Sequence, residues 1–304
     1  MKVTALAGGT GSAKLLRGLS RLPVELTVVA NVGDNVWMYG AYVCPDLDIG
    51  CYTLAGIADT ERGWGVAGDT FAALQRFSEL GLETWFRLGD RDLAVCLART
   101  EMMRRGSTLT QATLAIRGSL GVKCSMLPAT DHPLETRVVT TTGDLHLQEF
   151  WVREHGQPRV KRVRYKGASD SRPTREVEAA IMSADRVVLC PANPVTSIGP
   201  MLAIPGFTKL LSKSPARITA LSPMAGRGSI SGPAGKLMES SGVRPDSVGA
   251  AGLYSRFLDA LIISKGDWRM RPEIEKLGVK CESSDIMIEG SDDETRLAKE
   301  LVSV

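Results

Sequence analysis

The hydrophobic pattern of the first thirty residues predicts a strand, a helix and a second strand. Residues 2–7 and 25–30 are short apolar runs with β-branched members, which is typical of buried strands. Between them lies a glycine-rich turn, followed at residues 13–22 by leucines at helical spacing. Two buried strands that are connected by a helix predict a parallel sheet with right-handed crossovers.

The pattern of the next seventy residues is mainly helical. Residues 53–58, 69–80, 90–104 and 108–116 are predicted helices with few strand signals between them, and Asp69 and Asp90 are predicted helix caps. We therefore expect residues 51–120 to form a helical insertion that packs over the carboxyl edge of the sheet and covers its cleft. The α/β core then comprises residues 1–50 and 121–304.

The remainder of the chain returns to strands and helices in alternation. Strands are predicted at 122–126, 136–142, 145–151 and 159–166, and Gly143-Asp144 joins the second and third in a hairpin. Helices at 175–183, 206–212 and 235–240 then alternate with strands at 186–190 and 216–221. This alternation predicts an α/β fold, Rossmann-like and doubly wound around a mostly parallel sheet.

Composition excludes several classes of protein. The chain has 304 residues with 37 basic and 34 acidic side chains, a net charge of +3, so no strong field would recruit nucleic acid. The basic run at 159–166 alternates with apolar residues, as in a half-exposed strand. No apolar stretch reaches the roughly 20 residues of a membrane span, and no signal peptide fits. Six cysteines without a C-x-x-C pair favour free thiols, and we expect a cytoplasmic protein.

The glycine turn after the first strand is a candidate phosphate site. Gly9, Thr10 and Gly11 open the predicted helix, where backbone N–H groups and the helix terminus attract anions. Lys14 is too far from Gly11 for a Walker A loop, and it replaces the third glycine of G-x-G-x-x-G. The second strand ends in Asn31 where a nicotinamide site has an acid. Glycines serve tight turns in any fold, but Lys14 favours the phosphate interpretation.

Acidic residues gather just after the second predicted strand. Asp34 follows that strand, and Asp46 and Asp48 lie two apart in a segment that we expect to be extended, so that both side chains point the same way. Clustered carboxylates repel each other unless a cation lies between them, and Mg²⁺ is a hard cation that also bridges a diphosphate. Any one of these aspartates alone fits a helix cap or a turn equally well.

Two further polar segments are candidate binding sites. Arg87 and Arg91 flank the start of the predicted helix at 90–104, where they either support a capped helix or hold an anionic substrate. A loop rich in turn formers follows the strand at 186–190, and its Asn193 and Ser197 would reach a nucleotide at the edge of the sheet.

Taken together, these motifs resemble those of the 2-phospho-L-lactate transferases of coenzyme F-420 biosynthesis. The resemblance covers essentially the whole chain, and a series of motifs in one order is far more specific than a lone glycine turn. The residues that carry it are Gly8-Gly9-Thr10-Gly11, Asn31 to Asp34, Cys44-Pro45-Asp46-Leu47-Asp48, Arg62-Gly63-Trp64-Gly65, Leu88-Gly89-Asp90-Arg91-Asp92, Gln148-Glu149-Phe150-Trp151, Asn193-Pro194 to Ser197-Ile198-Gly199-Pro200 and Ser231-Gly232-Pro233-Ala234-Gly235-Lys236.

The resemblance implies a function and a set of site residues. It implies that a phospholactyl or phosphoenolpyruvyl group moves from a guanosyl diphosphate donor to the ribityl hydroxyl of the deazaflavin Fo, with release of GMP, and that the enzyme is a homodimer. It implies catalytic roles for Asp34, Asp46 and Asp48, with Mg²⁺ held by Asp34 and Asp48. Fo would bind near Asp48, Arg87 and Arg91. The nucleotide would contact Gly9, Thr10, Gly11, Lys14, Asn31, Asn193, Ser197 and Gly199.

One rival interpretation comes from related regulatory proteins that bind nucleotide sugars. They share the glycine turn and the fold, and such a protein would bind a uridine-diphosphate sugar without catalysing the transfer. The acidic pair Asp46 and Asp48, together with Arg87 and Arg91, favours the transferase, because a binding protein needs no carboxylate cluster facing an acceptor.

Overall fold

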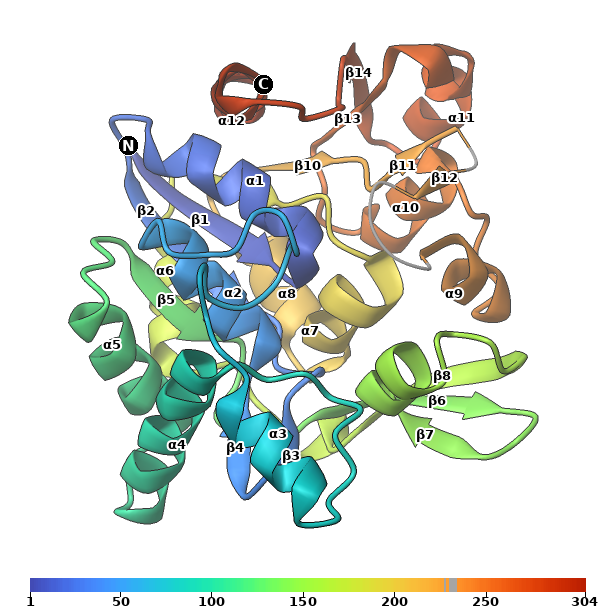
Figure 1. Cartoon of the computed structure of the whole chain (residues 1–304). Helices are drawn as coiled ribbons and strands as arrows, with labels where there is room; N and C mark the ends of the chain where they lie inside the picture. The colour runs from blue at the N-terminus through green and yellow to red at the C-terminus, as the bar shows by residue number, and fades with distance from the viewer. Residues whose placement is uncertain (227, 230–233) are drawn as a thin grey trace.

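A seven-stranded sheet forms the centre of the molecule (Figure 1). The computed structural model describes residues 1–226, 228–229 and 234–304. All neighbouring strands of this sheet are parallel, so the predicted Rossmann-like α/β class is confirmed. Across the sheet, the strands are β14 (Lys280–Ser284), β13 (Ala260–Ser264), β10 (Arg217–Leu221), β9 (Arg186–Leu189), β1 (Lys2–Ala7), β2 (Glu25–Ala30) and β5 (Ser125–Pro128).

The strand order reverses between β1 and β9, at the middle of the sheet. From β1 the chain builds outward through β2 to β5, and from β9 it builds the other way through β10 and β13 to β14. The pairs Ala7 with Ala30 and Leu6 with Leu189 bring the ends of β1, β2 and β9 to the same edge. A reversal of this kind leaves a crevice outside the carboxyl ends of the strands, where α/β proteins bind their ligands.

Helices pack against the buried strands of the central sheet. Gly18 of α1 allows close packing against α12, because a Cβ there would overlap the carbonyl oxygen of Glu294. The helices outside the predicted insertion are α1 (Gly9–Ser20), α2 (Pro45–Leu54), α6 (Arg175–Met182), α7 (Gly199–Ala203), α8 (Phe207–Lys213), α9 (Ala234–Ser240), α10 (Ser247–Tyr254), α11 (Arg271–Glu275) and α12 (Ser291–Ser303).

The predicted helical insertion contains three helices, α3 (Ala72–Glu79), α4 (Asp90–Arg104) and α5 (Leu109–Ser119). Asp69 and Asp90 each cap the other's helix. Asp69 accepts hydrogen bonds from the N–H groups of Arg91 and Asp92 in α4, and Asp90 accepts those of Ala72 and Ala73 in α3. This exchange holds the starts of α3 and α4 side by side.

The predicted helix at 53–58 is wrong, because that region only ends a helix that begins earlier. Helix α2 starts at Pro45 and ends at Leu54, so the expected boundary between residues 50 and 51 falls inside it. Helix α2 packs against α1 and β2 and therefore belongs with the sheet rather than with α3 to α5. A short hairpin of β3 (Val36–Met38) and β4 (Ala41–Val43) leads into it.

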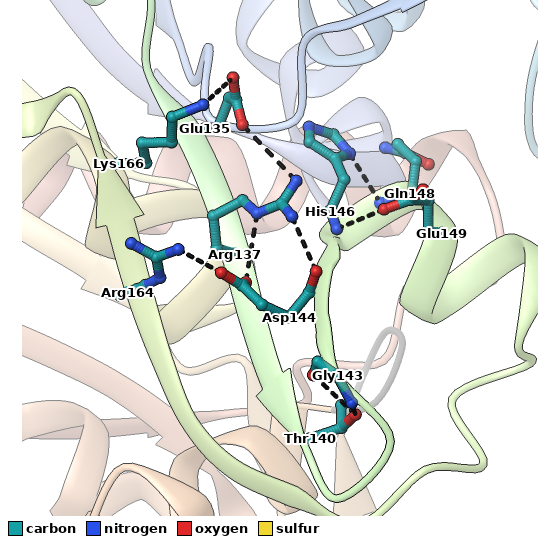
Figure 2. A network of polar contacts seen from close by, with 10 residues as sticks. All are labelled: Glu135, Arg137, Thr140, Gly143, Asp144, His146, Gln148, Glu149, Arg164 and Lys166. Atoms are coloured by element: carbon teal, nitrogen blue, oxygen red, sulfur yellow. Dashed lines mark hydrogen bonds and ion pairs between the residues drawn. The ribbon is translucent and has the colours of Figure 1, made fainter.

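A second, antiparallel sheet lies beside the central one. It consists of β7 (Asp144–His146), β6 (Glu135–Thr140) and β8 (Val160–Lys166), and the hairpin of β6 and β7 confirms the predicted turn. Figure 2 shows alternating charges across its strands, with Arg137 and Arg164 both bonded to Asp144. The predicted strand at 145–151 is too long, since a π-helical turn follows at Glu149–Arg153. A small hairpin, β11 (Met224–Ala225) with β12 (Gly228–Ser229), completes the strands described.

Candidate active site

A cavity of about 810 Å³ opens at the carboxyl edge of the central sheet. Its floor comes from the ends of β1 and β9 and from the start of α2, as the reversal of strand order predicts. One wall comes from residues 64–92 of the insertion and another from residues 147–155 after β7. Of the predicted site residues, the cavity lining includes Gly9, Thr10, Asp34, Asp46, Asp48, Arg87, Asn193 and Ser197.

Asn31 links two of the cavity carboxylates at the end of β2. Its amide nitrogen lies 3.1 Å from Oδ1 of Asp34 and 2.8 Å from Oδ2 of Asp46, and its amide oxygen accepts the N–H of Gly33. Asn31 is fully buried. It therefore positions carboxylates, and the structure does not place it against the space for a nucleotide.

Asp46 binds the start of helix α1. Its Oδ1 accepts the backbone N–H of Gly9 at 2.7 Å, which satisfies a helix N-terminal donor within the protein. The expected extended segment is wrong, because Asp46 and Asp48 lie in the first turn of α2 after Pro45. Residues two apart on a helix point in different directions, so the two carboxylates have different neighbours.

Burial weakens the charged state of the Asp34 and Asp46 carboxyls. Burial, and then the charge of Asp46, raise the pKa of Asp34 well above its ordinary value, and the hydrogen bond from Asn31 opposes this only in part. Burial also raises the pKa of Asp46, to about 6. Among the described residues, neither carboxylate has an ion-pair partner. A bound cation would restore the charged form of both.

Asp48 faces a different environment, built by α4. Arg99 of α4 forms an ion pair with both oxygens of Asp48, and each side chain is almost completely buried. Asp92, also from α4, lies beside this pair and accepts a 2.7 Å hydrogen bond from the hydroxyl of Tyr52. The Sγ of Cys96 lies 3.7 Å from Asp48 and 3.9 Å from Asp92.

The Asp92 carboxyl is strongly perturbed by these neighbours. Burial and then the charge of Asp48 raise its pKa to about 7, while Tyr52 and Arg99 act in the opposite direction. Burial also raises the pKa of Tyr52. Perturbed carboxyls in a cavity are common at functional sites.

The glycine turn is tightly packed against the loop after β9. A Cβ on Gly8 would lie 2.6 Å from the Cβ of Ser197, and Gly9 has a positive φ of 64°. Gly9 and Thr10 line the cavity, whereas Gly11 lies outside the lining. Lys14 also lies outside it, and its Nζ contacts the carbonyl oxygen of Ile288 at 2.6 Å. The structure therefore does not bring Lys14 to the site.

The loop after β9 reaches the cavity with Asn193, Thr196 and Ser197. The side chain of Asn193 caps the turn at Pro194–Ile198 by accepting the N–H groups of Val195 and Thr196. Gly199 lies outside the lining, and its Cα faces the hydroxyl of Tyr165 so closely that a Cβ would overlap it. The role of Gly199 is therefore packing of this loop.

Aromatic side chains contribute to both walls of the cavity. Trp64, Trp85 and Phe86 come from the insertion, and Trp151 comes from the turn after β7. Arg87 lines the wall that the insertion forms, with its guanidinium 4.9 Å from the ring centre of Phe71. Arg91 points elsewhere, to the carbonyl of Ala67, and is exposed. A flat aromatic ligand fits a wall of this composition.

The donor set of the cavity fits a hard divalent cation. Four carboxylates line it, against two basic side chains in the lining, Arg87 and His155. Oxygen ligands of this kind suit Mg²⁺. Asp48, Asp92 and Cys96 also come within 4.8 Å of one another, but a thiol is a poor magnesium ligand.

Sequence reasoning did not assign roles to Asp92, Arg99, Tyr52 or His155. A signal for the first two was present, because Asp92, Cys96 and Arg99 are spaced four and three apart and so share one face of α4. Polar and charged groups on the buried face of a helix need hydrogen-bond or ion-pair partners, so this pattern indicates a buried polar cluster. No comparable signal marks His155, which reaches the cavity through a positive φ of 51° in a turn.

Comparisons with known proteins support this architecture. Two crystal structures from Bacillus halodurans, one described as a member of the UPF0052 family, superpose on the chain with TM-scores of 0.65 and 0.67. Both are 18% identical in sequence, and 99% of each chain is covered. The likeness establishes the class of fold, which is Rossmann-like α/β.

Sequence relatives identify the family. The model of the family described as 2-phospho-L-lactate transferase CofD matches residues 3–292. The 2-phospho-L-lactate transferase of Methanosarcina acetivorans is 38% identical over 98% of this chain and 97% of its own length. That of Methanothermobacter thermautotrophicus is 40% identical over 99% and 97%. The chain belongs to the 2-phospho-L-lactate transferase family, as its motifs indicated.

The family motif at 231–236 has its first three residues, Ser231, Gly232 and Pro233, outside the described residues. Within the described ranges, no helix has the length and apolar character that crossing a membrane requires.

Proposed function

We propose that the protein transfers a phospholactyl or phosphoenolpyruvyl group from a guanosyl diphosphate donor to the ribityl hydroxyl of Fo and releases GMP. The observation that supports this most strongly is the composition of the cavity. It combines a glycine turn, four carboxylates and several aromatic side chains in a member of the 2-phospho-L-lactate transferase family. These are the parts that a diphosphate donor, a divalent cation and a flat ring require.

The donor would bind at the junction of β1 and β9. Its phosphates would lie against the backbone of Gly9 and Thr10 at the start of α1, where the helix terminus favours negative charge. Asn193 and Ser197 would contact the guanosine from the facing loop. Because Asp46 already accepts the N–H of Gly9, the remaining donors and the metal would hold the phosphates.

Asp34 and Asp48 would hold Mg²⁺, with Asp46 beside them. The ion would supply positive charge to the diphosphate and to the leaving oxygen of GMP. The raised pKa of Asp34, caused first by burial and then by the charge of Asp46, fits a site that is completed by a cation. We propose this ligand set for the protein on the chemistry of the carboxylates alone.

Fo would lie against the aromatic side chains of the insertion, with its ribityl chain toward Asp48. Trp64 and Trp85 would stack on the ring, and Arg87 would hold its polar edge. The ribityl oxygen forms a bond to the phosphorus that carries the three-carbon acid, and the bond from that phosphorus to GMP breaks. Asp48 would accept the hydroxyl proton as the new bond forms, and a weak base suffices because phosphoryl transfer depends mainly on positioning.

The proposal predicts a pattern of ligand binding that a thermal unfolding assay can measure. Fo, and GDP with Mg²⁺, should each raise the unfolding temperature, since a ligand that binds only the folded state stabilises it by about 2.7 kcal/mol at 100 times its Kd. NAD and uridine-diphosphate sugars should leave the temperature unchanged. Stabilisation by a uridine-diphosphate sugar and not by Fo would contradict the transferase proposal and favour a regulatory protein that binds nucleotide sugars.

We also propose that the enzyme acts as a homodimer in the cytoplasm.

A further inference from the structure

Arg99 is a buried arginine that lies behind the cavity rather than in it. It is 1% exposed and is among the largest fully buried side chains of the described residues. Its Nη1 lies 3.1 Å from Oδ2 of Asp48 and 3.2 Å from the carbonyl oxygen of Tyr42, and its Nη2 binds Oδ1 of Asp48. The guanidinium is thus fixed at two points, one on α2 and one on β4.

This ion pair is difficult to explain by stability alone. Burial of two charges costs several kcal/mol per ion, and apolar replacements of buried pairs are often neutral or stabilising. The Nε of Arg99 is also buried and has no hydrogen-bond partner among the described residues. Asp34, Asp46 and Asp92, which line the same cavity, have no ion-pair partner in the described chain. Arg99 therefore serves Asp48 selectively.

The geometry determines which part of Asp48 faces the cavity. A carboxylate has about four lone-pair positions, and a bidentate arginine occupies two of them from behind. Asp48 lines the cavity, so its remaining lone pairs are available on that side. We propose that Arg99 is a positioning residue for the acceptor: it fixes the Asp48 carboxylate so that its free lone pairs accept the ribityl hydroxyl groups of Fo. This inference rests on the proposed function.

Arg99→Lys tests the proposal, because lysine keeps the positive charge and cannot bind both oxygens of Asp48 in the bidentate geometry of arginine. At saturating Mg²⁺, we expect the KM for Fo to rise about 10-fold or more, as for other residues that orient a binding group, and the KM for the guanosyl donor to stay within about twofold. Direct titration calorimetry should show the same loss in the Kd for Fo. An unchanged KM for Fo, or equal increases for both substrates, would overturn the proposal.

Arg117→Lys is the matched control. Arg117 is partly buried and, like Arg99, has an Nε with no hydrogen-bond partner among the described residues. It donates to the carbonyls of Val122, Lys123 and Cys124, which follow α5 and lie outside the cavity. Both substitutions can lower stability. Only Arg99→Lys should change Fo binding, and an equal effect of Arg117→Lys would reduce Arg99 to a structural role.

A double-mutant cycle keeps the test informative if Arg99→Lys is poorly stable. In the Asp48→Asn background the charge that Arg99 orients is absent, so Arg99→Lys should cause no further loss in the Kd for Fo. Additive losses would show that Arg99 acts independently of Asp48 and would contradict the proposal. If wild-type protein neither binds Fo nor transfers the group, the proposed function itself fails and this inference with it.

Discussion

Gly8 lies where three segments of the site come closest together. A Cβ at this position would lie 2.6 Å from Cβ of Ser197, and 3.1 Å from both Cβ of Asn31 and Oδ2 of Asp46. None of these groups can move freely, because each is buried and bonded within the floor of the cavity. The glycine here is a requirement of packing between β1, β2 and the loop after β9, and not only of phosphate binding.

Gly8→Ala should therefore destabilise the protein by roughly 1–3 kcal/mol and lower activity, as overpacking of a closed site does. Urea unfolding and the transfer rate measure the two effects. Gly118→Ala is the control, since a Cβ in that part of α5 meets open space and alanine favours the helix by roughly 0.5–1 kcal/mol. Equal stability of the Gly8 variant and the wild type would contradict the described packing.

The two aspartates of α2 should respond differently to truncation. Asp48→Ala leaves Arg99 buried without a partner, so we expect a loss of about 3–5 kcal/mol in the free energy of unfolding. Asp46→Ala removes only hydrogen bonds from Gly9 and Asn31, and the loss should be nearer 1–2 kcal/mol, on the order of a helix cap. Chemical denaturation without metal compares them, and similar losses would disprove the assignment of partners.

Single residues show where sequence reasoning succeeds. Asp34, Asp46 and Asp48 were predicted to gather after the second strand, and Arg87 was either a support for a capped helix or a ligand for an anionic substrate; all four line the cavity. Lys14 was misplaced, because its position on α1 follows the sequence but the direction of its side chain depends on a carbonyl at Ile288, far along the chain. Contacts of this range leave no local pattern.

At the scale of elements, the start of α2 carried a signal that was not used. Pro45 stands at the first helical position with Asp46 and Asp48 in the first turn, a combination typical of helix N-termini. Strands of the central sheet were easier to predict, because burial on both faces leaves short continuous apolar runs. The end of the strand at His146 could not be predicted, since the chain turns there. The carboxylate of Glu149 accepts the backbone N–H of His146 in this turn.

The turn after β7 should make stability depend on pH through His146 (Figure 2). Its Nδ1 accepts the N–H of Gln148, and burial lowers its pKa below 6.5. Below pH 6.5 the unfolded chain therefore binds more protons than the folded one, so stability is complete above that pH and falls as the pH falls through it.

His146→Gln should flatten this dependence between pH 7.5 and 5.5, as measured by urea unfolding at several pH values. The exposed His132→Gln serves as the control and should leave the slope unchanged. A wild-type slope in the His146 variant would show that other groups cause the dependence.

For the whole molecule, the fold class followed from the sequence and the shape of the site did not. Alternating strands and helices predicted the doubly wound sheet, and the reversal between β1 and β9 then places the cavity. Its walls, by contrast, are assembled from residues 64–92 and 147–155, which only the tertiary packing of the insertion and the antiparallel sheet brings together.

The excess of carboxylates predicts that Mg²⁺ stabilises the free protein. Asp34→Asn should reduce the rise in unfolding temperature on adding Mg²⁺, because it removes a cavity ligand. Asp144→Asn is the control, because Asp144 lies on β7 of the antiparallel sheet, outside the cavity, where it pairs with Arg137. This substitution should leave the rise in unfolding temperature unchanged. If both variants retain the full effect, Mg²⁺ does not bind at the cavity.

The most direct measurement is mass spectrometry of the reaction products from purified protein with Fo, lactyl-diphosphoguanosine and Mg²⁺, beside a sample containing EDTA. The account predicts that Fo gains a phospholactyl group and that GMP appears in equal amount. Both products should form only in the reaction that contains Mg²⁺, and not in the reaction that contains EDTA. If no product forms with this donor, the enolpyruvyl donor is tested in the same way. Absence of product with both donors, although Fo and Mg²⁺ are present, would contradict the proposed transfer.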